Sequence, residues 1–138
     1  MTSVVAIVLV LGILIFFHEL GHFAVAKSLG IGVRTFALGF GKRIAGFTFG
    51  GTEYRLCLVP LGGYVQLMGE TPGEELPGDE DARKNFSQRP PWQRMLVVAA
   101  GPVFNFILAL LIYAGVFLLA GQQMLAPTIG AVQEGTPA

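Results

Sequence analysis

Charged residues are scarce in this 138-residue chain, where they make up 13% of the sequence, against roughly 25% in an average soluble domain. The nine basic and nine acidic residues cancel, so no net charge attracts nucleic acid, and no nucleic-acid partner is expected. A single cysteine excludes a disulfide framework and any metal site built from a cysteine cluster. Hydrophobic residues make up 53% of the chain, and where they lie decides between a membrane protein and an apolar soluble core.

Two apolar segments are long enough to cross a membrane. Residues 4–26 carry no polar side chain before His18, and their length of about 23 residues exceeds the roughly 20 that a span needs. Residues 95–120 are interrupted only by one asparagine and small residues, and an aromatic and a basic residue just before them suit the membrane–water boundary. We predict transmembrane helices over residues 1–26 and 91–120.

A cleavable signal peptide is the alternative for the first segment, because residues 24–26, Ala-Val-Ala, are similar to a cleavage site. However, no lysine or arginine precedes the apolar run, and cleavage there would remove both histidines of the chain. A retained transmembrane helix is therefore the favoured interpretation.

The region between the two apolar segments carries all nine basic residues. Because lysine and arginine accumulate on the cytoplasmic side of membrane spans, we expect this region in the cytoplasm and the tail after Gly121 outside. Residues 27–69 are rich in glycine, β-branched and aromatic residues, and they predict two strands, 53–59 and 63–68, joined by a turn at 60–62. Such an apolar hairpin suits partial immersion in the membrane, where protein or a cavity buries its backbone.

Residues 18–22 have the sequence HELGH, an H-E-x-x-H motif inside the first apolar segment. His18 and His22 are four residues apart, so on a helix both imidazoles lie on one face and can bind one ion. Glu19 is offset from His18 by about 100° around the helix, where it can act as the catalytic base that takes a proton from water. Zn²⁺ is the expected ion, because its catalytic sites use three protein ligands and one exchangeable water.

Chance is the alternative for this motif, since two histidines and a glutamate can occur together on a packed helix. An ionisable side chain in the middle of a span costs about 2.5–3.5 kcal/mol, so three within five residues favour a bound cation. Other catalytic classes have little support. Cys57 has no histidine to spare as a partner, and no glycine-rich loop ends in Lys-Ser or Lys-Thr for binding phosphate.

The chain resembles the site-2 protease family of intramembrane zinc metalloproteases, and most closely the bacterial branch, the regulator of sigma-E protease type, which degrades anti-sigma factors and signal-peptide remnants. The similar segments follow the family's order: the metal motif at 18–23, FALGFG at 36–41, a hairpin at 53–65, WQR at 92–94, AGPVFNF with its G-x-x-x-N motif at 100–106, and the opening of a PDZ domain at 129–138.

This resemblance implies an α-helical integral membrane protein, in which two transmembrane helices carry an inserted membrane re-entrant β-hairpin. It implies an acidic linker at 70–90 on the cytoplasmic side and the start of an extracytoplasmic PDZ-like domain at 121–138. The family's third zinc ligand is an aspartate in an L-D-G-type motif, which this sequence lacks. We therefore expect an N-terminal fragment that is inactive alone, from a multi-pass protein of the bacterial inner (cytoplasmic) membrane.

The resemblance also implies a substrate: the transmembrane segment of a single-pass protein already trimmed on its outer side, reached within the lipid bilayer. A peptide bond in a helix must be unwound before attack, and the freed backbone then needs new partners. The hairpin edge can supply them by strand addition, and the residues expected to bind substrate are Asn105, Tyr54, Gly62 and Gly63. Asn105 can equally be a polar residue that packs two helices.

Two other function classes account for part of the pattern. A non-hydrolytic metal-binding membrane protein, such as a transporter fragment, would use both histidines but would not need Glu19 in particular. A structural membrane anchor would tolerate the loss of both histidines. Substitution of Glu19 separates the protease from the first alternative.

Overall fold

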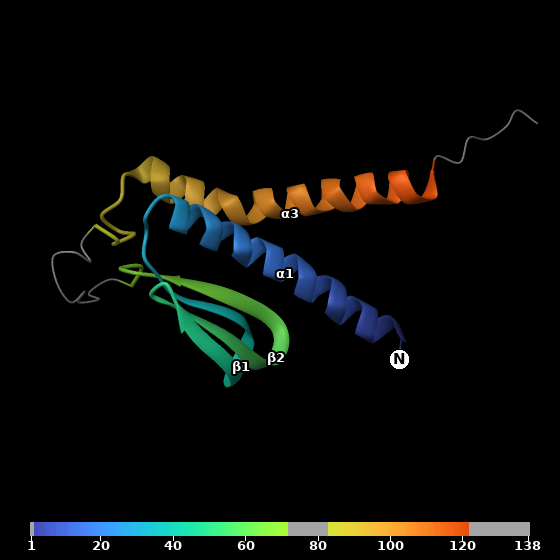
Figure 1. The fold of residues 1–138 in the computed structure, drawn as a ribbon, viewed down its shortest axis with the longest axis horizontal. Helices are drawn as coiled ribbons and strands as arrows, with labels where there is room; N and C mark the ends of the chain where they lie inside the picture. The colour runs from blue at the N-terminus through green and yellow to red at the C-terminus, as the bar shows by residue number, and fades with distance from the viewer. Residues whose placement is uncertain (1, 72–82, 122–138) are drawn as a thin grey trace, which may run out of the picture.

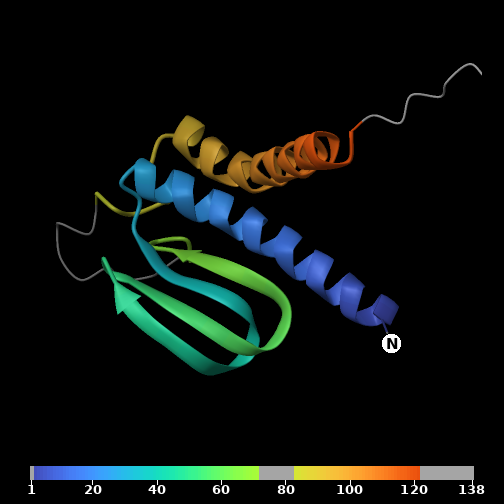
Figure 2. The same ribbon diagram turned by 45° about the vertical axis from the view of Figure 1, so that its right-hand side comes forward.

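The computed structural model describes residues 2–71 and 83–121 as two long helices and a bent β-hairpin (Figure 1). In chain order the elements are helix α1, strands β1 and β2, and helix α3, which span Thr2–Ser28, Val33–Phe49, Thr52–Leu67 and Pro91–Ala120. Helix α1 lies between α3 and the hairpin in both ribbon views (Figures 1 and 2). The predicted PDZ start, and most of the predicted acidic linker, lie outside the described residues.

Both helices are long and apolar enough to cross a membrane. The candidate spans are Val4–Ser28, with 25 residues, and Pro91–Ala120, with 30 residues, and each has a window of mean hydropathy 2.5. Only 6% of the residues in each window are buried by the rest of the described chain. Apolar surface of this extent needs lipid or another apolar partner to cover it. By length and composition, the two predicted spans are therefore present as helices.

Proline and glycine mark the two ends of α3. Pro91 occupies its first turn, where the missing N–H costs least. Gly121 takes a positive φ of 68° after the last turn and donates its N–H to the carbonyl of Phe117 at 3.1 Å. Pro102 lies inside the helix, where it removes one backbone hydrogen bond. The helix nonetheless continues without interruption to Ala120.

The chain of the hairpin reverses at Gly50 and Gly51 as well as near the predicted turn at 60–62. These two adjacent glycines have φ values of 57° and 75°, a left-handed conformation that suits two-residue hairpin loops and that other residues adopt at a cost. Residues 60–62 lie inside β2, at the bend between the two predicted strands. The predicted reversal is present, because 53–56 run in the same direction as 35–38 and 63–66 run in the opposite direction. The predicted direct pairing of 53–59 with 63–68 is wrong, because the first half of β1 lies between these segments.

β1 pairs with β2 in a strongly bent two-stranded sheet. Residues 35–38 each have two partners, one within 53–56 and one within 63–66; Phe36, for example, pairs with both Tyr54 and Val65. The first half of β1 therefore lies between two segments of β2. Among the pairings of the described residues, 63–67 contact β1 on one side only, which makes this segment an edge of the sheet.

An ion-pair cluster links β1 to β2. Glu53 accepts hydrogen bonds from Arg55 and Arg43, each at 2.6 Å. The hydrogen bond from Arg55 and the charges of both guanidinium groups hold the pKa of the Glu53 carboxyl below its ordinary value, against an opposing effect of desolvation. Through Arg43 and Glu53 the cluster joins β1 to β2.

A small buried core fixes the end of α1 that carries His22. Its side chains come from both helices and both strands, and they are Ala26, Ile31, Val33, Leu67 and Val97. The segment before α3 is tied in by backbone bonds, from Gly32 N–H to the Lys84 carbonyl at 2.9 Å and from Phe86 N–H to the Met68 carbonyl at 2.8 Å. Residues far apart in the sequence therefore meet at this junction.

Candidate metal centre

Two glycines allow α1 and α3 to approach closely beside the histidines. A Cβ atom added to the buried Gly21 would lie 2.9 Å from both the carbonyl carbon of Ala100 and Cγ of Phe104. Separations below 3 Å do not occur between such atoms, so only glycine fits at this crossing. Small residues serve the same purpose wherever membrane helices pack backbone to backbone.

His22 is held by the backbone of α3. Its Nδ1 lies 2.7 Å from the carbonyl oxygen of Val97. Because a carbonyl oxygen only accepts hydrogen bonds, Nδ1 must carry the proton, and the neutral ring then keeps a free lone pair on Nε2. A histidine ligand fixed in this way is typical of zinc sites, where the outer partner sets both the tautomer and the ring orientation.

The Nε2 atoms of both histidines face one gap in the helix interface. A Cβ atom added to Gly101 would lie 2.5 Å from Nε2 of His22 and 2.6 Å from Nε2 of His18. The two rings contact edge to face, with centroids 4.8 Å apart. The missing side chain of Gly101 thus leaves a cradle lined by two imidazole nitrogens, which is the donor arrangement that a single zinc ion needs from an H-E-x-x-H helix.

A third protein ligand is not among the residues that the structure describes, since no group of three His, Cys, Asp or Glu side chains there could hold a metal ion. His18 and His22 fit the zinc ion as two of its ligands. The remaining protein ligand of a catalytic site must come from elsewhere.

The side chain of Glu19 lies against the hairpin. A Cβ atom added to Gly63 would lie 3.3 Å from Cγ of Glu19, so this part of the sheet edge passes directly over the carboxylate-bearing side chain. Glu19 and His22 also line a common cavity of about 280 Å³. The other lining residues come from the sheet edge, the segment before α3, and α3 itself: Tyr64, Val65, Leu67, Glu70, Phe86, Val97 and Val98.

The structure brings two of the four residues predicted to bind substrate to this centre. Asn105 is half-buried, with its Nδ2 atom 3.4 Å from Nδ1 of His18, and Gly63 lies against Glu19. Tyr54 instead packs among aromatic rings, with its centroid 4.9 Å from that of Phe47. Gly62 lines a separate apolar cavity of about 410 Å³ between the first half of α1 and the hairpin.

Sequence reasoning missed three contributors to the centre. Gly101 was recognised only as part of a motif, and its role follows from the closeness of the imidazoles. Glu70 was assigned to an acidic linker, yet it lines the cavity of Glu19 and accepts the backbone N–H of Leu67 at 3.2 Å. The Val97 carbonyl is a backbone group, so its position cannot be inferred from any residue type.

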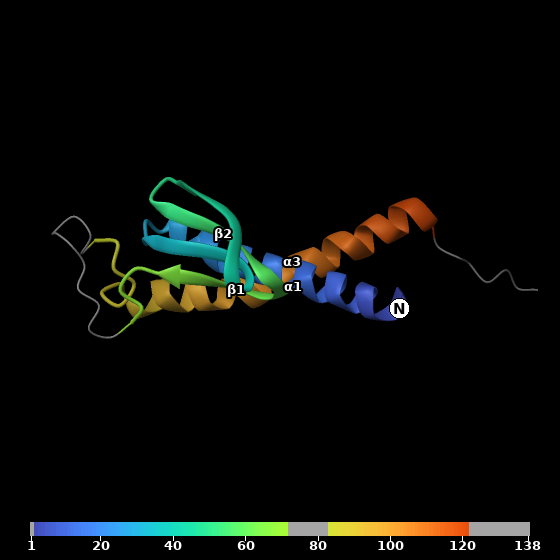
Figure 3. The ribbon, with the colours of Figure 1, turned by 90° about the horizontal axis from the view of Figure 1, so that it is seen from below.

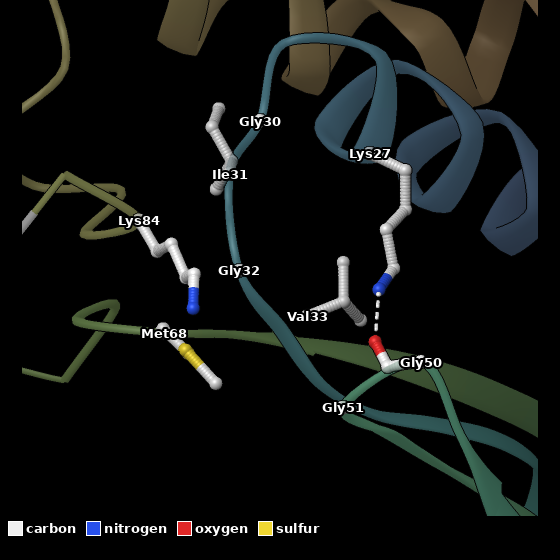
Figure 4. A pocket seen from close by; sticks show the side chains of 9 residues that line it. All are labelled: Lys27, Gly30, Ile31, Gly32, Val33, Gly50, Gly51, Met68 and Lys84. Carbon is white, nitrogen blue, oxygen red and sulfur yellow. Dashed lines mark hydrogen bonds between the residues drawn. The ribbon is translucent and has the colours of Figure 1, made fainter. Parts of the chain in front are cut away.

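A third pocket, of about 200 Å³, lies beyond the C-terminal end of α1, and neither histidine lines it (Figure 4). Lys27 and Lys84 line it from opposite sides, together with several glycines. The ammonium group of Lys27 donates a hydrogen bond to the Gly50 carbonyl at 3.1 Å. This contact ties the helix end to the hairpin turn. The two histidines that could bind a metal do not line this pocket.

Several curated proteins that are named as zinc metalloproteases are similar to this chain. Similar curated proteins include ones from Brucella suis, 39% identical over 99% of this chain, and Campylobacter jejuni, 46% identical over 96%. One from Helicobacter pylori is 43% identical over 89%. Each is named "Putative zinc metalloprotease", and the chain spans 38%, 36% and 35% of their respective lengths. The sequence model described as peptidase family M50 matches residues 6–136, and the chain therefore belongs to the M50 family, the site-2 protease family of metallopeptidases.

Proposed function

We propose that this chain carries the metal-binding and catalytic half of an intramembrane zinc endopeptidase. The observation that supports the proposal best is the shared gap at Gly101, toward which Nε2 of both His18 and His22 points. Glu19 stands at the adjoining cavity, beside the sheet edge. Two nitrogen ligands and one carboxylate base, set on one helix of a chain with two candidate spans, are the parts that peptide hydrolysis within a membrane requires.

His18 and His22 hold the zinc ion in this proposal. When bound, zinc supplies Lewis-acid catalysis, polarising the scissile carbonyl and making water a better nucleophile. Glu19 accepts the proton of the attacking water and passes it to the leaving nitrogen. The cavity beside Glu19 and His22 receives the unwound peptide, and its apolar walls from α3 limit the entry of bulk water.

The sheet edge is the proposed docking strand for the substrate. Leu67 N–H bonds to Glu70, whereas the next N–H along the chain, from Met68, bonds back to Gly32 within the fold. Because these groups alternate in direction along a strand, Val65 and Gly63 present their backbone groups on the same open side as Leu67. An extended peptide pairing with them would pass over Glu19, which lies against Gly63.

The wider setting of the protein follows from the same proposal. The hairpin is re-entrant in the bilayer, residues 27–90 face the cytoplasm, and residues 121–138 begin an extracytoplasmic PDZ-like domain. The third zinc ligand is an aspartate beyond Ala138. Substrates are previously trimmed single-pass membrane proteins, such as anti-sigma factors or signal-peptide remnants, cleaved in regulated intramembrane proteolysis at the bacterial inner membrane.

The test is to replace Glu19 in the full-length protein. We expect Glu19→Gln to abolish cleavage of a model transmembrane substrate while zinc content stays at the wild-type level, because the base is lost and both imidazoles remain. Glu53→Gln is the matched control, since it makes the same chemical change in the ion pairs of the hairpin. Normal turnover by Glu19→Gln would refute the protease assignment. Loss of zinc in this variant would show that Glu19 takes part in metal binding and is not only the base.

A further inference from the structure

The amide of Asn105 is placed to control one imidazole of the metal centre. It lies on α3 one helical turn after Gly101, and its Nδ2 atom is 3.4 Å from Nδ1 of His18. Its Oδ1 atom is buried and has no hydrogen-bond partner among the described residues. A buried amide oxygen without a partner costs free energy, so this orientation leaves Asn105 unsatisfied beside a group that can donate.

A half-turn of the amide about its Cβ–Cγ bond exchanges the positions of its oxygen and nitrogen. The nitrogen and oxygen of an asparagine amide have nearly the same shape, and their assignment follows from the hydrogen bonds they make. After the turn, Oδ1 occupies the position facing His18 and accepts a hydrogen bond from Nδ1–H. The oxygen is then paired, the nitrogen takes its former place, and the proton of His18 stays on Nδ1, away from the gap at Gly101.

This orientation makes the two histidines equivalent. His22 already donates from Nδ1 to the Val97 carbonyl at 2.7 Å. Val97, Gly101 and Asn105 are spaced by four residues, so they lie along one face of α3. Along that face the first holds His22, the second leaves room for both Nε2 atoms, and the third reaches His18.

We propose that Asn105 is a positioning residue that accepts a hydrogen bond from His18 Nδ1–H and so keeps Nε2 of His18 unprotonated and aimed at the metal gap. The proposal rests on the zinc-binding role of the two histidines. It differs from a substrate-binding role, in which Asn105 would act on the reacting peptide. An outer partner of this kind commonly changes metal affinity by about 10- to 100-fold.

Histidine tautomers in the metal-free protein provide the first test. Full-length protein with ¹⁵N-labelled histidine is stripped of metal, and the ring nitrogens of His18 are assigned by comparison with His18→Gln. We expect wild-type His18 to be protonated on Nδ1. In Asn105→Ala the proton is expected to distribute over both nitrogens, and in Asn105→Asp it is expected to return to Nδ1, because a carboxylate can only accept.

Zinc affinity, measured by competition with a chelator, provides the second test. We expect Asn105→Ala to bind zinc about 10- to 100-fold more weakly and Asn105→Asp to bind at least as tightly as wild type. Gln93→Ala is the matched control, since it removes an amide from the same helix outside the metal centre and should change neither reading. Circular dichroism verifies that each variant keeps its helices.

Two results would overturn the proposal. If Asn105→Asp behaves like Asn105→Ala, the amide donates to His18 and the tautomer assignment is wrong. If Asn105→Ala lowers kcat while His18 keeps its proton on Nδ1 and zinc affinity is unchanged, Asn105 acts on the substrate instead. The tautomer and the zinc affinity are both measured without turnover, so these two tests stand apart from the Glu19 experiment that tests the protease itself.

Discussion

Gly101 matters to the centre because it has no side chain. The nearest atoms to its absent Cβ are ring atoms of His18 and His22, all closer than 3 Å. We therefore expect Gly101→Ala to displace both imidazole rings. Stoichiometric zinc binding, and cleavage with it, should then be lost. Gly115→Ala is the control on the same helix, because no atom lies within 4 Å of its added methyl group. Metal analysis of both purified variants checks this.

The outcome that contradicts this expectation is specific. Retention of stoichiometric zinc by Gly101→Ala would mean that the imidazoles bind the ion away from the gap at Gly101. A loss of zinc in Gly115→Ala as well would point to a general defect in helix packing instead.

At the scale of residues, the H-E-x-x-H motif predicted how its own two histidines lie, but the groups that surround them were not predicted. The four-residue spacing predicted that His18 and His22 share a face, and the structure places their Nε2 atoms at one gap. The Val97 carbonyl could not be predicted, because every residue has one and only the helix crossing selects it. Tyr54 was chosen from a resemblance, and the aromatic ring of Phe47 stacks against it instead of leaving it free at the cavity.

At the scale of elements, the sheet edge is the feature that function depends on most. Val65 presents its N–H on the open side in the proposed docking mode, so Val65→Pro removes that donor while the pairing with β1 remains. We expect cleavage efficiency to fall roughly 2- to 10-fold, the equivalent of one net hydrogen bond, chiefly through KM. Zinc content should not change.

Val65→Ala serves as the control for this edge variant, because it shortens the side chain and keeps the N–H. Equal loss in both variants would assign the effect to packing in the cavity. Unchanged efficiency in Val65→Pro would exclude strand addition at this position and move the docking site to another part of the cavity wall.

The helices were predictable and the pairing of the strands was only partly so, for a physical reason. An apolar run of more than 20 residues leaves few alternatives to a helix, whereas strand pairing depends on contacts between distant residues. The chain reverses near Pro60 and Gly62, which have the residue types of a turn, but it also reverses at Gly50 and Gly51, where φ is positive at both positions. A Gly-Gly pair between two strand-forming segments was the available signal.

At the scale of the whole molecule, the two helices contact each other over only part of their length. Figure 3 and Figure 1 both show that α1 and α3 lie together where the C-terminal half of α1 meets the N-terminal half of α3, and that they diverge beyond it. The metal gap lies in the shared part. Long apolar stretches of both helices stay exposed, including Leu118 and Leu119 at 86% and 92%. The described residues therefore cover one side of the metal centre. Lipid or other protein segments must cover its other sides.

Residues 1–138 expressed alone should insert into membranes and bind zinc much more weakly than the full-length protein, without protease activity. His18 and His22 supply two ligands, whereas catalytic zinc sites use three from the protein, and a site open to lipid or water has altered affinity and electrostatics. The fragment is purified in detergent, titrated with zinc and assayed on a cleavable transmembrane peptide. A fragment with both histidines changed to glutamine measures the background. Tight stoichiometric zinc together with cleavage that depends on Glu19 would show that these residues already contain the third ligand.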